Sequence, residues 1–265
     1  MNEQSESIRT LPLPAPRARA PEPVATETFA DKSLPRESFA GLGLRSADFR
    51  NSDLTMADFR GASLEGANFE GADLTGAQFQ NAQLRGAQFT DAQLVYASFS
   101  GSQIDDAVFT RAFLHHADLR NAQASSARFT WARLMHATLG GAHCAGADFT
   151  GTCLRFADCR SADLSFATFE FADIASAKLT AASLRGALLL SANLDGASLA
   201  AADLTDASLG RTVLTNCHDV DRAKGLATIS HVAPSAIDVV SFARLRERLP
   251  AVFVAGLGID LAARD

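Results

Sequence analysis

Histidine is the side chain in this sequence best suited to metal binding or proton transfer, and four of the six histidines lie close together. They are His115, His116, His136 and His143. A metal site would need carboxylate or thiolate ligands beside them at a regular spacing, and the sequence has none. The four cysteines form no CxxC pair, which argues against a disulfide framework or a zinc knuckle. The sequence therefore predicts no metal ion and no cofactor.

Catalytic motifs are missing as well. The chain has no GxSxG motif, no HExxH motif and no glycine-rich phosphate loop, and its glycines are spread through the sequence. Without a convergent polar site, the chain is expected not to be an enzyme.

Bulky rings occur in the middle of the chain at positions that are small or polar elsewhere. The set is Tyr96, Phe113, His116, Trp131, His136, Phe156, Phe166 and Phe171. Tyr96, His116, His136 and Phe156 are separated by intervals of 20 residues, so they could stack on one face. Two interpretations are open: the rings shield the backbone at corners of the fold, or they form a docking face for a partner protein.

The element that positions these rings is a repeat of five residues. From Phe39 to Leu214 every fifth residue is apolar through 36 units. Two residues earlier in each unit, from Ala47 to Ala207, the residue is alanine in 30 of 33 units. Five matches neither the helical period of 3.6 nor the strand period of 2, and a short strict repeat is typical of a solenoid.

A second period shows how many units make one turn. One register of phenylalanines repeats every 20 residues without interruption: Phe49, Phe69, Phe89, Phe109, Phe129, Phe149 and Phe169. A neighbouring register changes from phenylalanine to leucine at Leu119, so a ten-residue period does not explain both. Four units per turn are therefore expected, with this phenylalanine ladder filling the interior.

The units resemble the pentapeptide-repeat family, whose tandem motif is A-[DN]-[LF]-x-x. Ala47-Asp48-Phe49, Ala67-Asn68-Phe69 and Ala202-Asp203-Leu204 match this motif. The resemblance implies an all-β solenoid, a right-handed four-sided pentapeptide-repeat β-helix of about nine coils with one pentapeptide per side. It also implies that the outer surface carries the function, because the interior is filled.

Acidic residues on that surface suggest a second function. Asp precedes the central apolar residue in 10 of the 36 units, and a branch of the family resists quinolones by imitating DNA and binding type II topoisomerase (gyrase). Here arginines follow many of the centres, as in Asp48-Phe49-Arg50, so the surface is expected to neutralise itself. The main expectation is a scaffold that binds a protein partner, with the DNA mimic as its alternative.

The two ends of the chain differ from the array, which is expected over residues 39–217. Residues 1–38 contain six of the eight prolines and predict a disordered, proline-rich tail of unassigned role. Residues 218–265 predict a cap with a helix near 235–249, starting at a capping box formed by Ser235 and Asp238. Leu226, Ile229 and Val232 are expected to cover the last coil.

The helix carries one apolar stripe that could close the array or join two chains. Its residues are Val239, Phe242, Leu245 and Leu249. The family resemblance suggests a homodimer through this segment.

The remaining composition argues against other partners. The net charge is −6 and no basic stripe occurs, so direct nucleic-acid binding is not expected. No signal peptide and no apolar run of membrane-spanning length is present, so a cytoplasmic protein is expected.

Overall fold

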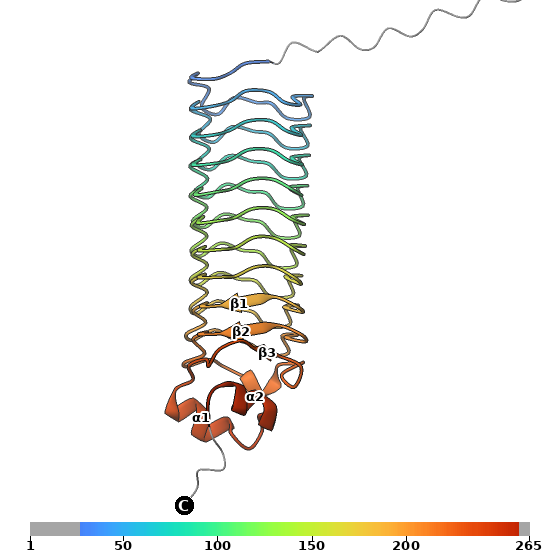
Figure 1. Ribbon diagram of the computed structural model, residues 1–265. Coiled ribbons are helices and arrows are strands. Elements are labelled where there is room, and N and C mark those ends of the chain that lie inside the picture. The colour runs from blue at the N-terminus through green and yellow to red at the C-terminus, as the bar shows by residue number, and fades with distance from the viewer. Residues whose placement is uncertain (1–26, 260–265) are drawn as a thin grey trace, which may run out of the picture.

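The chain forms a rod of stacked coils, closed at its C-terminal end by short helices (Figure 1). The computed structural model describes residues 27–259. Single-residue parallel bridges join positions 20 apart, from Thr28 and Asp48 through Ser198 and His218. One turn therefore takes four pentapeptides, and the architecture is a β-helix solenoid, as the repeat predicted.

Each unit supplies one side of the coil and one corner. The Phe49 N–H donates to the Asn68 carbonyl at 2.7 Å, and the Asp48 N–H donates to the Glu27 carbonyl at 2.9 Å, so each turn bonds to both neighbours. Corners are four-residue turns: the Ala47 N–H donates to the Leu44 carbonyl at 3.1 Å, and Ser46, the third residue, has φ +56°. A positive φ at this position is the requirement of a type II turn.

The interior is a column of apolar side chains. Phe49 lies over Phe69 with ring centroids 4.8 Å apart, and Phe69 lies over Phe89 at 4.9 Å. The stack reaches Phe169, and a second phenylalanine stack meets its ring edges at 5.5–5.8 Å. The alanines two residues before each centre are buried from Ala47 to Ala207. The expected core ladder is therefore present.

The array begins earlier than residue 39. Thr28 and Ser33 already bridge the next turn, and the Phe29 ring stacks on Phe49 at 4.7 Å. The segment 27–38, expected to belong to the tail, is thus part of the first coil. The rest of the expected tail, residues 1–26, lies outside the described residues.

At the other end the period lengthens before it is lost. Bridge intervals grow to 21 residues at Asp203 and Lys224, then 22 at Ser208 and Ser230, then 23 at Val213 and Ala236. A 3-10 helix at Val220–Arg222 takes up the first extra residue. Here strands β1 (Leu188–Leu190), β2 (Ser208–Gly210) and β3 (Ser230–His231) form a parallel sheet in the order β1-β2-β3.

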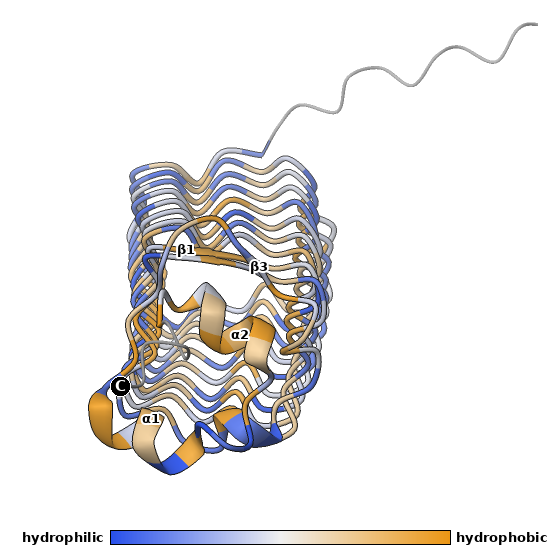
Figure 2. Ribbon diagram, turned by 60° about the horizontal axis from the view of Figure 1, so that its bottom comes forward, coloured by the Kyte–Doolittle hydropathy of each residue, from blue (hydrophilic) through white to orange (hydrophobic). Residues whose placement is uncertain are grey.

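The cap consists of two short helices, α1 (Val239–Leu245) and α2 (Ala251–Gly256). Figure 2 shows α2 across the end of the tube and α1 at its edge. The capping box starting at Ser235 was wrong, because Ala236 still bonds to the array; Asp238 is the N-cap and accepts from the Ser241 N–H at 2.7 Å. Leu226 and Ile229 are buried as expected, whereas Val232 is 64% exposed.

Candidate interaction surface

Seven of the eight predicted rings occupy corner positions with a left-handed backbone. They are Tyr96, His116, Trp131, His136, Phe156, Phe166 and Phe171, with φ between +57° and +60°. Residues with a β-carbon are strained in this conformation, and glycine adopts it at many other corners, including Gly151 and Gly186. The rings are nevertheless exposed, for example 64% for Tyr96 and 58% for Trp131. The backbone at these corners is therefore strained, and burial of the rings within the chain does not offset that strain.

Four of the rings form a continuous stack, which we call the aromatic ladder: Tyr96, His116, His136 and Phe156. Their centroids are separated by 5.0 Å at each step, and the planes lie within 14° of parallel. The ladder therefore presents one ribbon of ring edges over four consecutive turns, as the 20-residue spacing predicted.

The ladder borders one side of the rod, which we call the aromatic wall: residues 91–96, 111–116, 131–136 and 151–156. Its opposite corner carries Trp131, whose ring lies against Gly151; a β-carbon at Gly151 would come within 2.4 Å of the indole. On the wall itself, the Arg133 guanidinium lies 4.8 Å from the centroid of the Phe113 ring. Trp131, Phe113 and Arg133 thus converge on one region.

This region is a groove of about 490 Å³, which we call the Trp131 groove. It is lined by Asp91, Arg111, Phe113, Trp131, Ala132, Arg133, Gly151 and Cys153. Sequence reasoning found the rings but missed Arg111, Arg133 and Cys153. The available signal was the register: Phe113, Arg133 and Cys153 follow one another at intervals of 20 residues and bridge in that order.

The remaining rings do not share this wall. Phe166 lies two corners away from the ladder along the chain, over Gly186, and is 70% exposed. Phe171 is on the corner column of Trp131 but separated from it by Gly151, and it lines a different groove with Leu190 and Val232. The eight predicted residues therefore form one wall with two outlying rings.

Several acidic side chains elsewhere on the rod are paired with arginines of the same unit. Asp48 receives the Nε–H of Arg50 at 2.9 Å, and Asp58 and Asp158 are held in the same way by Arg60 and Arg160. Hydrogen bonds from these guanidinium groups lower the pKa of each of the three carboxyl groups. The expectation of a self-neutralising surface agrees with this geometry.

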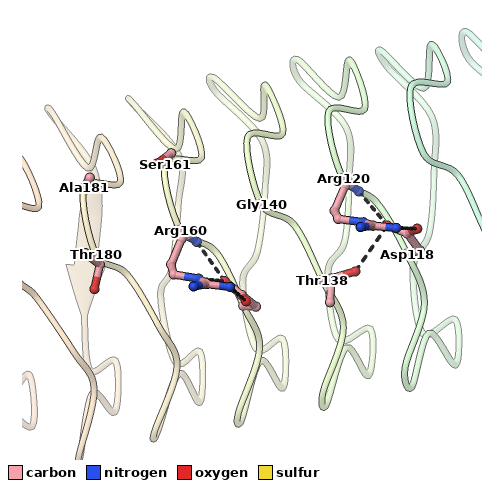
Figure 3. Close-up of a pocket in the computed structure, with 9 residues that line it drawn as sticks. Asp118, Arg120, Thr138, Gly140, Arg160, Ser161, Thr180 and Ala181 are labelled. Atoms are coloured by element: carbon pink, nitrogen blue, oxygen red, sulfur yellow. Dashed lines mark hydrogen bonds and ion pairs between the residues drawn. The ribbon is translucent and has the colours of Figure 1, made fainter.

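A hollow of about 770 Å³ lies among such pairs (Figure 3). It opens at Gly140, where no side chain separates Arg120 from Arg160. Figure 3 shows each guanidinium directed at the aspartate of its own unit, and Arg120 donates to Asp118 at 2.9 Å. These charges are already satisfied, so the hollow offers little to a charged ligand.

The histidines and cysteines of the described chain lie in different surroundings. No group of three potential ligands in the described residues is arranged to hold a metal ion, and two of the four clustered histidines, His116 and His136, are stacked on each other. Burial raises the pKa of the Cys144 and Cys159 thiols, in the latter to about 12. Cys153 alone among the four is partly exposed.

The apolar stripe of the C-terminal segment is divided by the fold. Leu245 and Leu249 are buried in the chain's own core, at 3% and 7% exposure, so they cannot form a dimer contact. Phe242 packs partly against the same core, and only Val239, 81% exposed, faces outward. The stripe therefore mainly caps the array. Val239 is the residue of the stripe that is exposed for contact with a second chain.

Comparison with known families agrees with the repeat geometry. The family described as pentapeptide repeats matches residues 44–81, 142–180 and 177–216, and the related pentapeptide repeat region matches residues 72–149. The chain belongs to the pentapeptide-repeat family. The comparison with curated proteins gave no match.

Solved structures of other pentapeptide-repeat proteins resemble this one. HetL of the cyanobacterium Nostoc sp. strain PCC 7120, involved in heterocyst differentiation regulation, is 25% identical over 76% of this chain and 92% of its own, with a TM-score of 0.46. A protein of the Arabidopsis thaliana thylakoid lumen is 33% identical over 37% of this chain and 66% of its own (TM-score 0.30). Full-length QnrB1, a plasmid-mediated fluoroquinolone resistance protein, is 18% identical over 82% and 98% (TM-score 0.39).

All three TM-scores are below 0.5, so no function is transferred from these proteins. Within residues 27–259, no helix has the length and apolar character needed to cross a bilayer.

Proposed function

We propose that this pentapeptide-repeat protein is a non-enzymatic scaffold that binds a partner protein through the aromatic wall. The observation that carries the proposal is the combination of strain and exposure at the ladder and at Trp131. Aromatic rings placed at left-handed corners destabilise the free chain, and a partner that buries them would supply the compensating contacts.

The alternative interpretation, that the rings shield the corner backbone, explains less. Gly76 occupies the same corner column one turn above Tyr96, and it has no side chain that could cover the corner backbone. A corner of this column therefore does not need a ring to shield it. Trp131 has no stacked ring in its own column, with Arg111 above it and Gly151 below. Shielding therefore gives no reason for tryptophan at this corner.

The proposal is tested by replacing Trp131 and Tyr96 together with glycine, the residue that suits a left-handed corner. The full chain is used as bait in its native host, and bound proteins are identified by mass spectrometry. A partner should be captured by the wild type, lost by the double variant, and retained by a control in which Met56 and Asn121, two other left-handed corners, become glycine. Equal capture by all three proteins would contradict the proposal, as would a marked fall in melting temperature of the Trp131 and Tyr96 variant.

The DNA-mimic function is the competing candidate, supported by the aspartates without an arginine partner. Asp53 and Asp73 are stacked one turn apart, and neither has an ion-pair partner among the described residues. A mimic needs a continuous negative field, and the paired units at Asp48 and Asp58 interrupt it. A supercoiling assay with purified gyrase decides between the two: we expect no inhibition at micromolar protein, and inhibition would favour the mimic.

A homodimer through the cap is a separate proposal. Its remaining contact would be Val239 and the neighbouring Val240, both exposed at the start of α1. Light scattering of the full chain and of a Val239→Glu variant would test it, since only a dimer through α1 would lose half its mass.

A further inference from the structure

The aromatic wall differs in charge from the chain that carries it. The whole protein has a net charge of −6, whereas the four sides of the wall contain three arginines, Arg111, Arg133 and Arg155, and one acidic residue, Asp91. Asp91 is engaged by Arg111, whose Nε–H donates to it at 2.7 Å. The wall is therefore a positive surface on a negative protein.

Arg133 is the cation on this wall with a free charge. Arg155 lies 3.3 Å from a carboxylate oxygen of Asp173, but Arg133 has no ion-pair partner among residues 27–259. Its neighbours in the same column are Phe113 above and Cys153 below, and neither is acidic. The guanidinium is held over the Phe113 ring at 4.8 Å, so it is positioned without being neutralised.

The His115 imidazole is a second group on this wall that the charge of Arg133 affects. The pKa of His115 is lowered, first by burial and then by the charges of Arg133, His116 and His136. A positive surface of this kind attracts anions.

We propose that the Trp131 groove binds an acidic peptide segment of the partner, with a carboxylate on Arg133 and a neighbouring apolar side chain against Trp131. This inference rests on the proposed function and specifies the chemistry of its partner. A carboxylate can accept two parallel N–H bonds from a guanidinium. The groove volume of about 490 Å³ is in the range of ligand sites, and the ring of Trp131 over Gly151 supplies its apolar floor.

A single-stranded nucleic acid is the other polyanion that stacks on aromatic rings. It is disfavoured because a nucleic acid binds along a track of several cations, and the wall provides one unpaired arginine. The test includes it as an outcome.

Trp131 is the only tryptophan of the chain, so its fluorescence reports directly on the groove. The full chain is titrated with a set of synthetic decapeptides that have glutamate at alternate positions and leucine or serine between them. A matched set has glutamine in place of glutamate. We expect the acidic set to shift the Trp131 emission with a dissociation constant on the order of 10 µM, weakening as salt is added. The same peptides should slow alkylation of Cys153, which lines the groove.

Two charge reversals locate the site. Arg133→Glu should weaken binding of the acidic peptides by about tenfold or more. Arg246→Glu makes the same change of net charge on the cap, at an exposed arginine with no ion-pair partner among the described residues, and should leave binding unchanged.

Several results would overturn the inference: no emission shift with any acidic peptide, equal binding of the glutamine set, or tighter binding of a single-stranded oligonucleotide. Failure of the proposed function looks different. The captured partner could require Trp131 and Tyr96 but bind Arg133→Glu as tightly as the wild type. That result would support partner binding through the aromatic wall and contradict an acidic ligand in the Trp131 groove. If capture does not depend on Trp131 and Tyr96, the proposed function itself fails.

Discussion

At the scale of single residues, the choice between a ring and glycine at a corner changes the stability of the free chain. A residue with a β-carbon is strained by roughly 1–2 kcal/mol in the left-handed region, and glycine is not. Glycine in turn loses more backbone entropy on folding, by about 0.5–1 kcal/mol. An exposed ring at a corner is therefore stabilising only if it makes contacts, and within the free chain some of these rings make few.

Phe166 gives the simplest test of this balance. It is 70% exposed, has φ +57°, and has Gly146 and Gly186 above and below it in its column. We expect Phe166→Gly to leave the free energy of unfolding unchanged or to raise it by up to about 1 kcal/mol, measured by urea denaturation. Phe169→Gly, three residues later at a buried core position, is the control and should destabilise by several kcal/mol. A loss of more than about 1 kcal/mol in Phe166→Gly would mean that the ring supports the fold.

At the scale of elements, the cap combines helices with a half-buried histidine whose ring nitrogens are shielded from solvent. The His231 ring on β3 packs edge-on against Phe253 of α2, with centroids 5.5 Å apart. Neither ring nitrogen has a hydrogen-bond partner within the described chain, and a β-carbon at Gly256 would come within 2.1 Å of the ring. Burial lowers the pKa of His231, so the folded cap favours the neutral imidazole.

The stability of the cap should therefore depend on pH. The unfolded chain binds a proton on this histidine near pH 6.5, and the folded chain only at lower pH. The contribution is fully present above pH 6.5 and is lost as the pH falls toward the folded pKa. Hydrogen exchange of α2 should accelerate between pH 6.5 and 5 relative to the central coils, after correction for the intrinsic rate. His231→Gln should remove the excess acceleration; if it persists in that variant, another group is responsible.

The elements also show what the sequence could predict. The five-residue period and the 20-residue phenylalanine register determine the coil, because each apolar centre must enter a narrow interior in line with the one above. The start of the array was missed because Glu27, Lys32 and Glu37 stand where later units have alanine. These positions are exposed in the first described coil, and a charged residue is tolerated there.

The helix boundary and the groove were hidden for different reasons. Ser235 and Asp238 have suitable spacing for a capping box, but Ala236 is still bonded to Thr212 and Leu214, so the chain remains extended until Asp238. The groove depends on which side chains occupy adjacent columns and how they lie, for example the indole over Gly151, and no period reports that. The right-handed sense and the count of about nine coils stay predictions.

At the scale of the whole molecule, the rod has no single centre. Each coil contacts the coils above and below it, and bridged residues are 20 positions apart in the sequence because one turn takes 20 residues. Stability in such a solenoid is approximately a sum of coil and interface contributions. Damage to one coil should therefore spread to its neighbours and weaken with distance along the axis.

A charge placed in the interior tests this behaviour. Phe109 is fully buried, with Phe89 above it at 4.8 Å and Phe129 below it at 4.9 Å. Phe109→Asp removes both stacking contacts and buries an unpaired carboxylate, which costs more than the roughly 3–5 kcal/mol of a large cavity. Phe156→Asp makes the same chemical change at an exposed left-handed corner, where aspartate is well tolerated, and should remain as stable as the wild type.

The distribution of the damage distinguishes a stack of coils from one cooperative unit. In Phe109→Asp, hydrogen exchange should lose protection first in the coils around residue 109, while the coils near Phe49 and the cap near Phe253 keep more of theirs. The local cost is large because the interior holds one apolar side chain per side and offers the carboxylate no polar partner, whereas distant coils keep all of their own bridges. Uniform loss of protection from Phe49 to Phe253 would show instead that the coils unfold together. An interior change in a distant coil would then destabilise the aromatic wall as strongly as an interior change in the coils that carry the wall.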